Sequence, residues 1–288
     1  MLKARHSAIK FFGLGSPTAA PLLYSYLKEH PEISLPATDP AFFSDVNRYA
    51  EGLAWYESQW PPAKEGVVQG ELAYDYLRYA PAAGLIARTY PTAKVLAVIE
   101  NPLLSVKVEY IEARRAGEGT ARGSLADFLA KNPEVLQRAC YGRQLVPYFS
   151  YYATTDLLVL TASEVRDDPL RAIATVFNHL GVDPKFVPLA LRHLVVEEED
   201  DEKKKPGLIK RTYRFLKRQI ANLYGVLRRL IKPPVVPVET AAVTALALRI
   251  EPALEAKLKQ YFAPDVERLE NLLRRSLKSD WGFDIEVK

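Results

Sequence analysis

Ala8-Ile-Lys-Phe-Phe-Gly-Leu-Gly-Ser-Pro-Thr-Ala-Ala20 is the stretch that decides the fold. Its apolar run predicts a buried strand, its glycines and proline predict a tight loop, and residues 22–28 have a helical composition. A strand that turns through glycines into a helix presents backbone N–H groups to an anion. The stretch therefore predicts an α/β fold, with either an anion loop or a plain strand-to-helix turn that contains Gly13, Gly15 and Ser16.

Length and composition limit the class of protein. With 288 residues, 48% of them hydrophobic, the chain can bury the core of one α/β domain. A net charge of +4 is too mild to indicate general polyanion binding, so we expect no nucleic-acid partner. One cysteine and four scattered histidines lead us to expect no metal site. We find no signal peptide and no apolar run near the roughly 18 residues of a membrane span, which favours a cytoplasmic protein.

Alternating strand and helix patterns predict a mostly parallel sheet of four or five strands with helices on both faces. The clearest strand is Lys94-Val-Leu-Ala-Val-Ile99, an apolar run that suits a parallel strand buried on both faces. We expect further strands at 67–70, with Glu71 at its carboxyl end, and at 156–161. We expect helices at 47–60, 102–115, 134–152 and 170–180. We also expect a helical segment at 75–89 that Pro81 interrupts, and a last helix at 255–277 with a break at Pro264.

The C-terminal third differs in composition. Acidic residues at 197–202 precede three lysines, which predicts a solvated, flexible connection over 197–205. We interpret 206–288 as a helical C-terminal part of the same single domain, 1–288. Residues 208–231 form an amphipathic pattern with a basic face, which is either a solvated helix side or a weak contact with an acidic membrane or a polyanionic acceptor.

The order and spacing of several segments resemble the bacterial-type sulfotransferases, which transfer a sulfuryl group from 3′-phosphoadenosine 5′-phosphosulfate to a hydroxyl or amine. The likeness spans about the whole chain and rests on 22–31, Gly70-Glu71, 93–99 with Asn101-Pro102, Tyr141, 157–160 with Asp168-Pro169, 230–234 and 261–265. It implies a three-layer α/β/α fold related to P-loop proteins, that nucleotide as donor, and no metal. It names neither the small-molecule or carbohydrate acceptor nor the oligomeric state.

The resemblance also implies roles for individual residues. Glu71 corresponds to the general base that takes the proton of the acceptor. The loop containing Gly13, Gly15, Ser16 and Thr18 would hold the 5′-phosphosulfate end of the donor, and Asn101 begins the helix near its 3′-phosphate. Lys210 matches a basic residue near the donor. A surface or helix-cap carboxylate is the alternative interpretation of Glu71, and we expect His30 at the surface.

Several positions depart from the family pattern, three of them where the family binds its donor. The first loop lacks the family's lysine, Glu100 stands where the family has an arginine, and Val108 stands where it has a serine. A carboxylate facing a phosphate replaces attraction by repulsion, although Glu100 also suits a helix start. We therefore keep two hypotheses: a sulfotransferase with weak or absent donor binding, and a catalytically silent, repurposed or redesigned binding protein.

Overall fold

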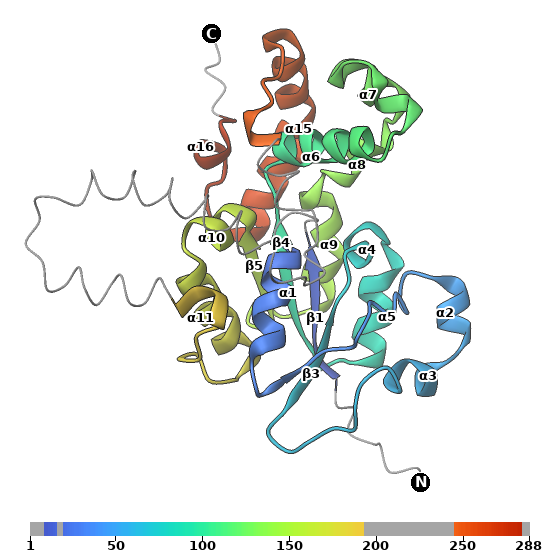
Figure 1. The fold of residues 1–288 in the computed structure, drawn as a ribbon, viewed down its shortest axis with the longest axis vertical. Coiled ribbons are helices and arrows are strands. Elements are labelled where there is room, and N and C mark those ends of the chain that lie inside the picture. Colours follow the sequence, from blue (N-terminus) through green and yellow to red (C-terminus); the bar gives the residue numbers. More distant parts are fainter. Residues whose placement is uncertain (1–8, 16–19, 193–244, 284–288) are drawn as a thin grey trace, which may run out of the picture. The chain divides into compact units, whose positions relative to one another are not determined.

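The computed structural model describes residues 9–15, 20–192 and 245–283 (Figure 1). Contacts divide the chain into two units, Met1–Pro188 with Val238–Lys288, and Leu189–Pro237. All strands described below belong to the first unit. Of the second unit only 189–192 are described, with a 3-10 turn η2 at Leu189–Leu191. The predicted segments 197–205 and 208–231 lie outside the described residues, and the single-domain boundary stays a prediction.

A five-stranded parallel sheet forms the centre of the first unit, as predicted. Its order is β2-β3-β1-β4-β5, with strands β1 (Ile9–Gly15), β2 (Ile33–Ser34), β3 (Val68–Leu72), β4 (Lys94–Ile99) and β5 (Leu157–Thr161). In the register of β1 and β4, Phe11 pairs with Lys94 and Gly15 with Val98. After β1 the chain forms β2 and β3 on one side of that strand and then β4 and β5 on its other side. The carboxyl end of β1 is therefore the switch point at which such sheets bind ligands.

Helices cover both faces of this sheet, which confirms the predicted three-layer fold. Figure 1 shows α1 (Ala20–Glu29), α10 (Ala162–Asp167) and α11 (Pro169–Leu180) on one side. The other side carries α4 (Asp75–Arg78), α5 (Pro81–Thr89) and α9 (Tyr141–Tyr151). The remaining elements are α2 (Val46–Ala50), α3 (Leu53–Glu57), α6 (Pro102–Arg115), η1 (Gly119–Arg122), α7 (Leu125–Lys131), α8 (Glu134–Arg138), α15 (Pro252–Leu273) and α16 (Lys278–Trp281).

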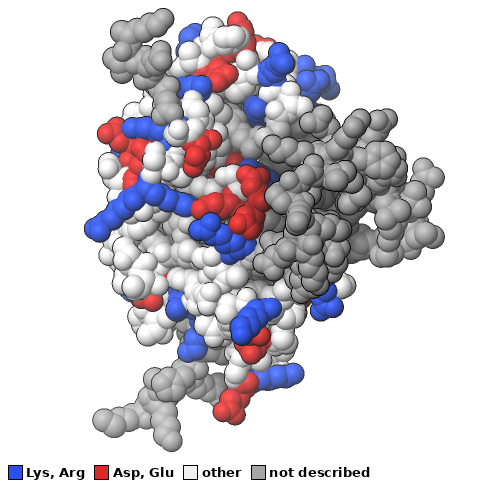
Figure 2. All heavy atoms as spheres, turned by 90° about the vertical axis from the view of Figure 1, so that its left-hand side faces the viewer, with Lys and Arg blue, Asp and Glu red and all other residues white. Residues whose placement is uncertain are grey.

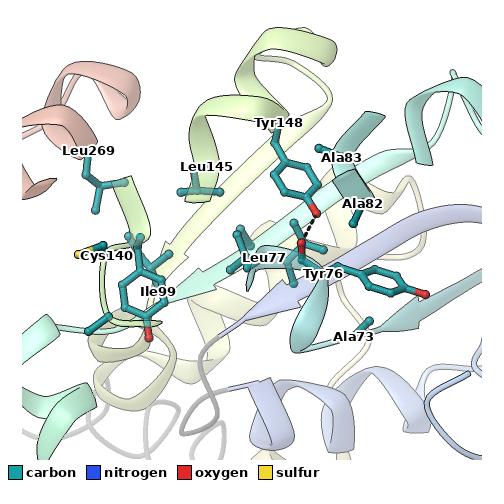
Figure 3. Packing of buried hydrophobic residues seen from close by; sticks show 14 of the residues in the cluster. Ala73, Tyr76, Leu77, Ala82, Ala83, Ile99, Cys140, Leu145, Tyr148 and Leu269 are labelled. Atoms are coloured by element: carbon teal, nitrogen blue, oxygen red, sulfur yellow. Dashed lines mark hydrogen bonds between the residues drawn. The ribbon is translucent and has the colours of Figure 1, made fainter. Parts of the chain in front are cut away.

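Apolar packing joins β1, β3 and α9 to the rest of the unit. Tyr148 of α9 is buried and donates a hydrogen bond of 2.8 Å to the carbonyl of Tyr76 at the centre of the cluster in Figure 3. Gly13 is required by close packing, because a Cβ there would lie 1.7 Å from Leu72 Cδ2. The lack of a side chain at Gly13 therefore allows β1 to pack closely against Leu72 of β3.

Three helix boundaries differ from the sequence prediction. The segment 47–60 forms two short helices because Gly52 adopts φ +83 between them. The segment 134–152 also divides, into α8 and α9. The C-terminal helix continues through Pro264 without the expected break, since the buried side chains of Phe262 and Val266 pack on both sides of that turn.

His30 lies in the core, so its predicted surface position was wrong. Its ring is 4.4 Å from that of Phe177 and 4.7 Å from that of Phe186. The backbone N–H of Glu32 donates to Nδ1, which leaves Nε2 to donate to the carbonyl of Asp183 at 3.0 Å. Two aromatic neighbours and two backbone partners together account for burial of the imidazole.

Candidate functional site

The structure describes four of the seven predicted site residues. Gly13 and Gly15 lie in the central strand β1, and Asn101 precedes α6. Glu71 lies within β3 and not after it, because the strand extends to Leu72. Ser16, Thr18 and Lys210 lie outside the described residues, so their predicted roles stay predictions.

Glu71 is a fully buried carboxyl group. Its Oε2 accepts a hydrogen bond from the Tyr56 hydroxyl, whereas Oε1 has no partner of normal geometry among the described residues. Burial raises the pKa of Glu71 to about 8, against a smaller lowering by the Tyr56 and Tyr76 hydroxyls beside it. Glu71 is therefore neither a surface group nor a helix cap, and the hydroxyls of Tyr56 and Tyr76 are its polar neighbours.

Aromatic side chains enclose this carboxyl group. Tyr56 stacks on Phe42 with ring centroids 4.5 Å apart and meets Trp60 edge-on at 5.0 Å. The Trp60 indole donates to the carbonyl of Gly70 at 2.9 Å, which fixes the ring beside β3. The backbone N–H of Phe43 donates to the Tyr76 hydroxyl at 3.1 Å. This enclosure supplies the low-dielectric surroundings that raise the pKa of Glu71.

A hollow of about 530 Å³ opens between the loop before α2 and helix α4. These two segments also contribute Phe43 and Tyr76 to the enclosure of Glu71. In the hollow, Arg78 lies 4.0 Å from Asp75 and 3.5 Å from Glu109, so its charge is already paired. The lining residues are Ala41, Ser44, Asp45, Val46, Asp75, Arg78 and Tyr79.

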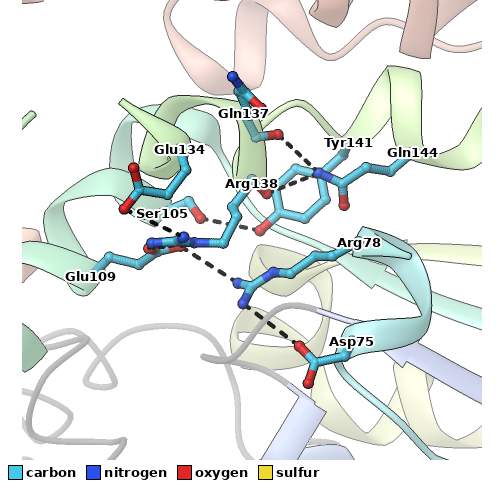
Figure 4. Close-up of polar contacts among 9 residues, drawn as sticks. All are labelled: Asp75, Arg78, Ser105, Glu109, Glu134, Gln137, Arg138, Tyr141 and Gln144. Atoms are coloured by element: carbon cyan, nitrogen blue, oxygen red, sulfur yellow. Dashed lines mark hydrogen bonds and ion pairs between the residues drawn. The ribbon is translucent and has the colours of Figure 1, made fainter. Parts of the chain in front are cut away.

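A polar cluster beside the hollow connects α4, α6, α8 and α9 (Figure 4). The Arg138 guanidinium donates through Nε to Glu109 Oε2 at 2.9 Å, and Arg78 reaches the same carboxylate. Ser105 and Tyr141 share a hydrogen bond of 3.1 Å. Both arginines are thus paired with Glu109, and each has a second acidic neighbour at 4.0 Å, Asp75 for Arg78 and Glu134 for Arg138. Tyr141 is held as a structural residue in the core.

Glu100 follows β4 at the carboxyl edge of the sheet and is buried. Its Oε1 accepts from the backbone N–H of Asn101 at 2.9 Å, which places the carboxylate at the start of α6 as predicted. Its Oε2 accepts from Arg166 Nη1 at 2.8 Å, a pairing that the sequence did not predict. The arginine position of the family pattern therefore holds an internal ion pair.

Asn101 and Val108 have structural contacts. The side-chain oxygen of Asn101 accepts from the N–H of Leu103 at 2.9 Å, and its amide nitrogen donates to the carbonyl of Trp281 at 3.2 Å. Val108 is fully buried with Leu104 and Ala245. The position that corresponds to the family's serine is thus part of an apolar cluster and offers no hydroxyl.

Sequence reasoning missed three residues of this site: Tyr56, Tyr76 and Arg166. The tyrosines lie in helical segments in which aromatic residues indicate packing. Arg166 is 66 positions from Glu100, and no local pattern relates the two. The sequence signal for Arg166 was Glu100 itself, because a carboxylate at the end of a buried strand requires a charged or hydrogen-bonding partner.

The described residues contain no group of three or more His, Cys, Asp and Glu side chains placed to hold a metal ion. Within the same ranges, no helix is long and apolar enough to cross a membrane.

Comparisons with known proteins point to one class of enzyme. No protein-family model matches the chain. A mouse bifunctional heparan sulfate N-deacetylase/N-sulfotransferase 4 is 24% identical over 197 residues, 62% of this chain and 23% of that protein. A human heparan sulfate glucosamine 3-O-sulfotransferase 6 is 24% identical over 166 residues, 56% of this chain and 48% of that protein. The chain thus spans 23% and 48% of the length of these two relatives.

The fold comparison covers more of the chain. A sulfotransferase structure from Alicyclobacillus acidocaldarius superposes with a TM-score of 0.67 at 21% identity, over 95% of this chain and 98% of that one. This likeness shows that the fold is that of a sulfotransferase. Together with the sequence relatives, it confirms the predicted resemblance to the sulfotransferase family.

Proposed function

We propose that the chain catalyses sulfuryl transfer to a hydroxyl or amine acceptor, with Glu71 as the general base. The observation that carries this proposal is the fully buried Glu71 carboxyl group in β3, whose pKa is raised to about 8. A base with a pKa near the working pH can take the proton of an acceptor as that acceptor attacks sulfur. The donor, 3′-phosphoadenosine 5′-phosphosulfate, supplies the sulfuryl group.

Tyr56 and the aromatic enclosure would prepare Glu71 for this role. The Tyr56 hydroxyl bonds Oε2, which holds the carboxyl group in place and leaves Oε1 for the acceptor proton. The enclosure keeps bulk water away from the carboxyl group, which supports its raised pKa. Opening of the segment around Phe43 would admit the acceptor, since Glu71 has no exposed surface.

The hollow supports an acceptor that is neutral or carries an amine. Asp45 and Asp75 line it, and the only lining cation among the described residues, Arg78, is paired with Asp75 and Glu109. A polyanionic sugar would meet repulsion there, whereas an amine would be attracted. We therefore propose that the acceptor differs in charge from the heparan sulfate named for the relatives.

The described residues do not complete a site for the nucleotide donor. At the carboxyl end of β4 the side chain is an acid, Glu100, that is already paired with Arg166. The helix that follows presents Val108, which is buried in an apolar cluster. Neither residue supplies a free cation or a hydroxyl to a phosphate. Of the steps of the proposed activity, donor binding therefore has the least support from the described residues.

These same observations favour a second candidate function, a binding protein that keeps the sulfotransferase fold without catalysis. In that case the hollow would hold a small neutral or cationic molecule, and Glu71 would stay a buried, protonated group. The Glu100–Arg166 pair and the full enclosure of Glu71 are the features that support it.

The test is transfer of radiolabelled sulfuryl groups from the donor to a panel of amines, neutral sugars and heparan oligosaccharides. Transfer that Glu71→Gln abolishes supports the enzyme, provided that Glu255→Gln keeps the parent rate. Glu255 is a suitable control because it forms an ion pair of 2.9 Å with Lys259 on α15, outside the site. Binding of panel members without transfer at millimolar donor supports the second candidate.

A further inference from the structure

We infer that Glu100 acts as an internal anion: its carboxylate occupies the Arg166 guanidinium and so prevents a phosphate monoester of the donor from binding at this edge of the sheet. Arg166 is then the specificity-determining residue for the anion, and Glu100 is its intramolecular competitor. This inference rests on the proposed function, because the anion is the 3′-phosphate of the nucleotide donor.

The contact geometry supports competition for Arg166. Its Nη1 lies 2.8 Å from Glu100 Oε2, and its Nη2 lies 3.4 Å from Oε1. A guanidinium recognises carboxylate and phosphate with the same pair of parallel N–H donors. The Glu100 carboxylate therefore uses the donors that a phosphate would need.

The exposure of the two side chains indicates how a ligand would approach. The Glu100 side chain is 3% exposed, whereas the Arg166 side chain is 27% exposed. The carboxylate thus lies on the inner side of the pair and the guanidinium reaches solvent. An external anion can meet Arg166 without entering the core, once the inner carboxylate no longer neutralises it.

The place of the pair in the sheet is the place where a ligand is expected. Val98 of β4 pairs with Gly15 at the end of β1, and Glu100 follows two residues later. The carboxyl end of β1 is the switch point of the strand order. The Glu100–Arg166 pair therefore lies beside the edge that proteins with this kind of sheet use for ligands.

A second arginine, Arg275, is paired with Glu164, which lies on the same helix as Arg166, α10. Arg275 donates to Glu164 Oε1 at 2.6 Å, and Glu164 Oε2 also accepts from the backbone N–H of Thr161, the N-cap residue of α10, at 2.6 Å. Figure 2 shows acidic and basic side chains next to one another on the face that it draws. Since a carboxylate of this chain balances each of the two arginines, removal of Glu100 alone should leave the positive charge of Arg166 without its partner.

The test compares nucleotide binding by the parent and by Glu100→Gln, measured by calorimetry with 3′-phosphoadenosine 5′-phosphate and with adenosine 5′-phosphate. We expect the first nucleotide to bind the variant about tenfold more tightly than the parent, because Arg166 gains an external partner. We expect the second, which lacks the 3′-phosphate, to change by less than about threefold. Glu100→Ala, also checked for folding by circular dichroism, serves as the second variant.

Two controls assign the gain to Arg166. Glu100→Gln combined with Arg166→Gln should return to the parent affinity, and Glu255→Gln, which removes one negative charge elsewhere, should not change it. An affinity of the folded Glu100 variants within about twofold of the parent would overturn the inference. An equal gain for both nucleotides, or a gain that survives the loss of Arg166, would do the same.

These outcomes are separate from those of the proposed function. A gain in binding without any sulfuryl transfer would reject catalysis and keep the role of Glu100. Transfer by the parent, with tight nucleotide binding that the Glu100 variants leave unchanged, would reject the role of Glu100 and keep catalysis.

Discussion

Glu71→Gln should change how the stability of the protein depends on pH. Burial raises the pKa of Glu71 to about 8 in the folded chain, from 4.5 for an exposed glutamate. The folded state therefore holds the proton more tightly than the unfolded state. The stability that this proton contributes is complete below pH 4.5 and is lost as the pH rises through 8.

The expected size of the effect follows from these two pKa values. Each pH unit between them removes about 1.4 kcal/mol from the free energy of unfolding, and the whole interval removes about 5 kcal/mol. The glutamine side chain introduced by Glu71→Gln cannot ionise, and its oxygen can still accept the bond from Tyr56. The variant should thus resemble the parent near pH 4.5 and be more stable by about 5 kcal/mol above pH 8.

Urea unfolding followed by circular dichroism between pH 4.5 and 9 measures this difference. Glu255→Gln is the matched control, because it makes the same substitution on α15, outside the site. Tyr56→Phe removes a hydroxyl that lowers the pKa of Glu71, so the loss of stability should continue to a higher pH before it levels off. A Glu71→Gln difference that stays constant from pH 5 to 8, or a variant less stable than the parent at pH 8, would refute the reasoning.

Two further predictions concern the fold and are measured by urea unfolding. Asp265→Asn should lower the free energy of unfolding by about 1–3 kcal/mol, because Asp265 accepts from the backbone N–H groups of Gly142 and Arg143 at 2.7 and 2.9 Å. Glu267→Gln, at an exposed position of the same helix, is the control. Equal losses of stability in the two variants would contradict the structural role of Asp265. Gly13→Ala should destabilise by several times the roughly 0.5 kcal/mol typical of surface changes. A Cβ at Gly119 would have no atom within 4 Å, so Gly119→Ala should leave the stability unchanged and serves as the control. A Gly13→Ala variant as stable as the parent would show that β1 and β3 are less tightly packed than the structure indicates.

The strands and the layers could be predicted because they depend on local pattern. A parallel strand buried on both faces is an apolar run such as 94–99, and its order with helices determines the architecture. Helix ends were predicted where a side chain or glycine ends the helix within a few residues, as at Asn101 and Gly181. The break at Gly52 was missed because the apolar periodicity continues across it.

The site could be predicted only in part. Glu71 was found because its strand and its neighbour Gly70 form a recognisable local motif. Its partner Tyr56 and the Arg166 partner of Glu100 come from other elements, and only the tertiary fold brings them together. The buried state of Glu71 likewise depends on rings from several segments, so its raised pKa could not be read from sequence.

The rate of sulfuryl transfer by the parent chain as a function of pH tests the central claim most directly. If Glu71 is the base, kcat/KM should rise tenfold per pH unit below about pH 8 and level off above it, since the ionised fraction of that carboxyl group limits the reaction. Glu71→Gln should show no transfer at any pH. A rate that does not change between pH 6 and 9, or a Glu71→Gln variant with the parent rate, would contradict the assignment of Glu71 as the catalytic base.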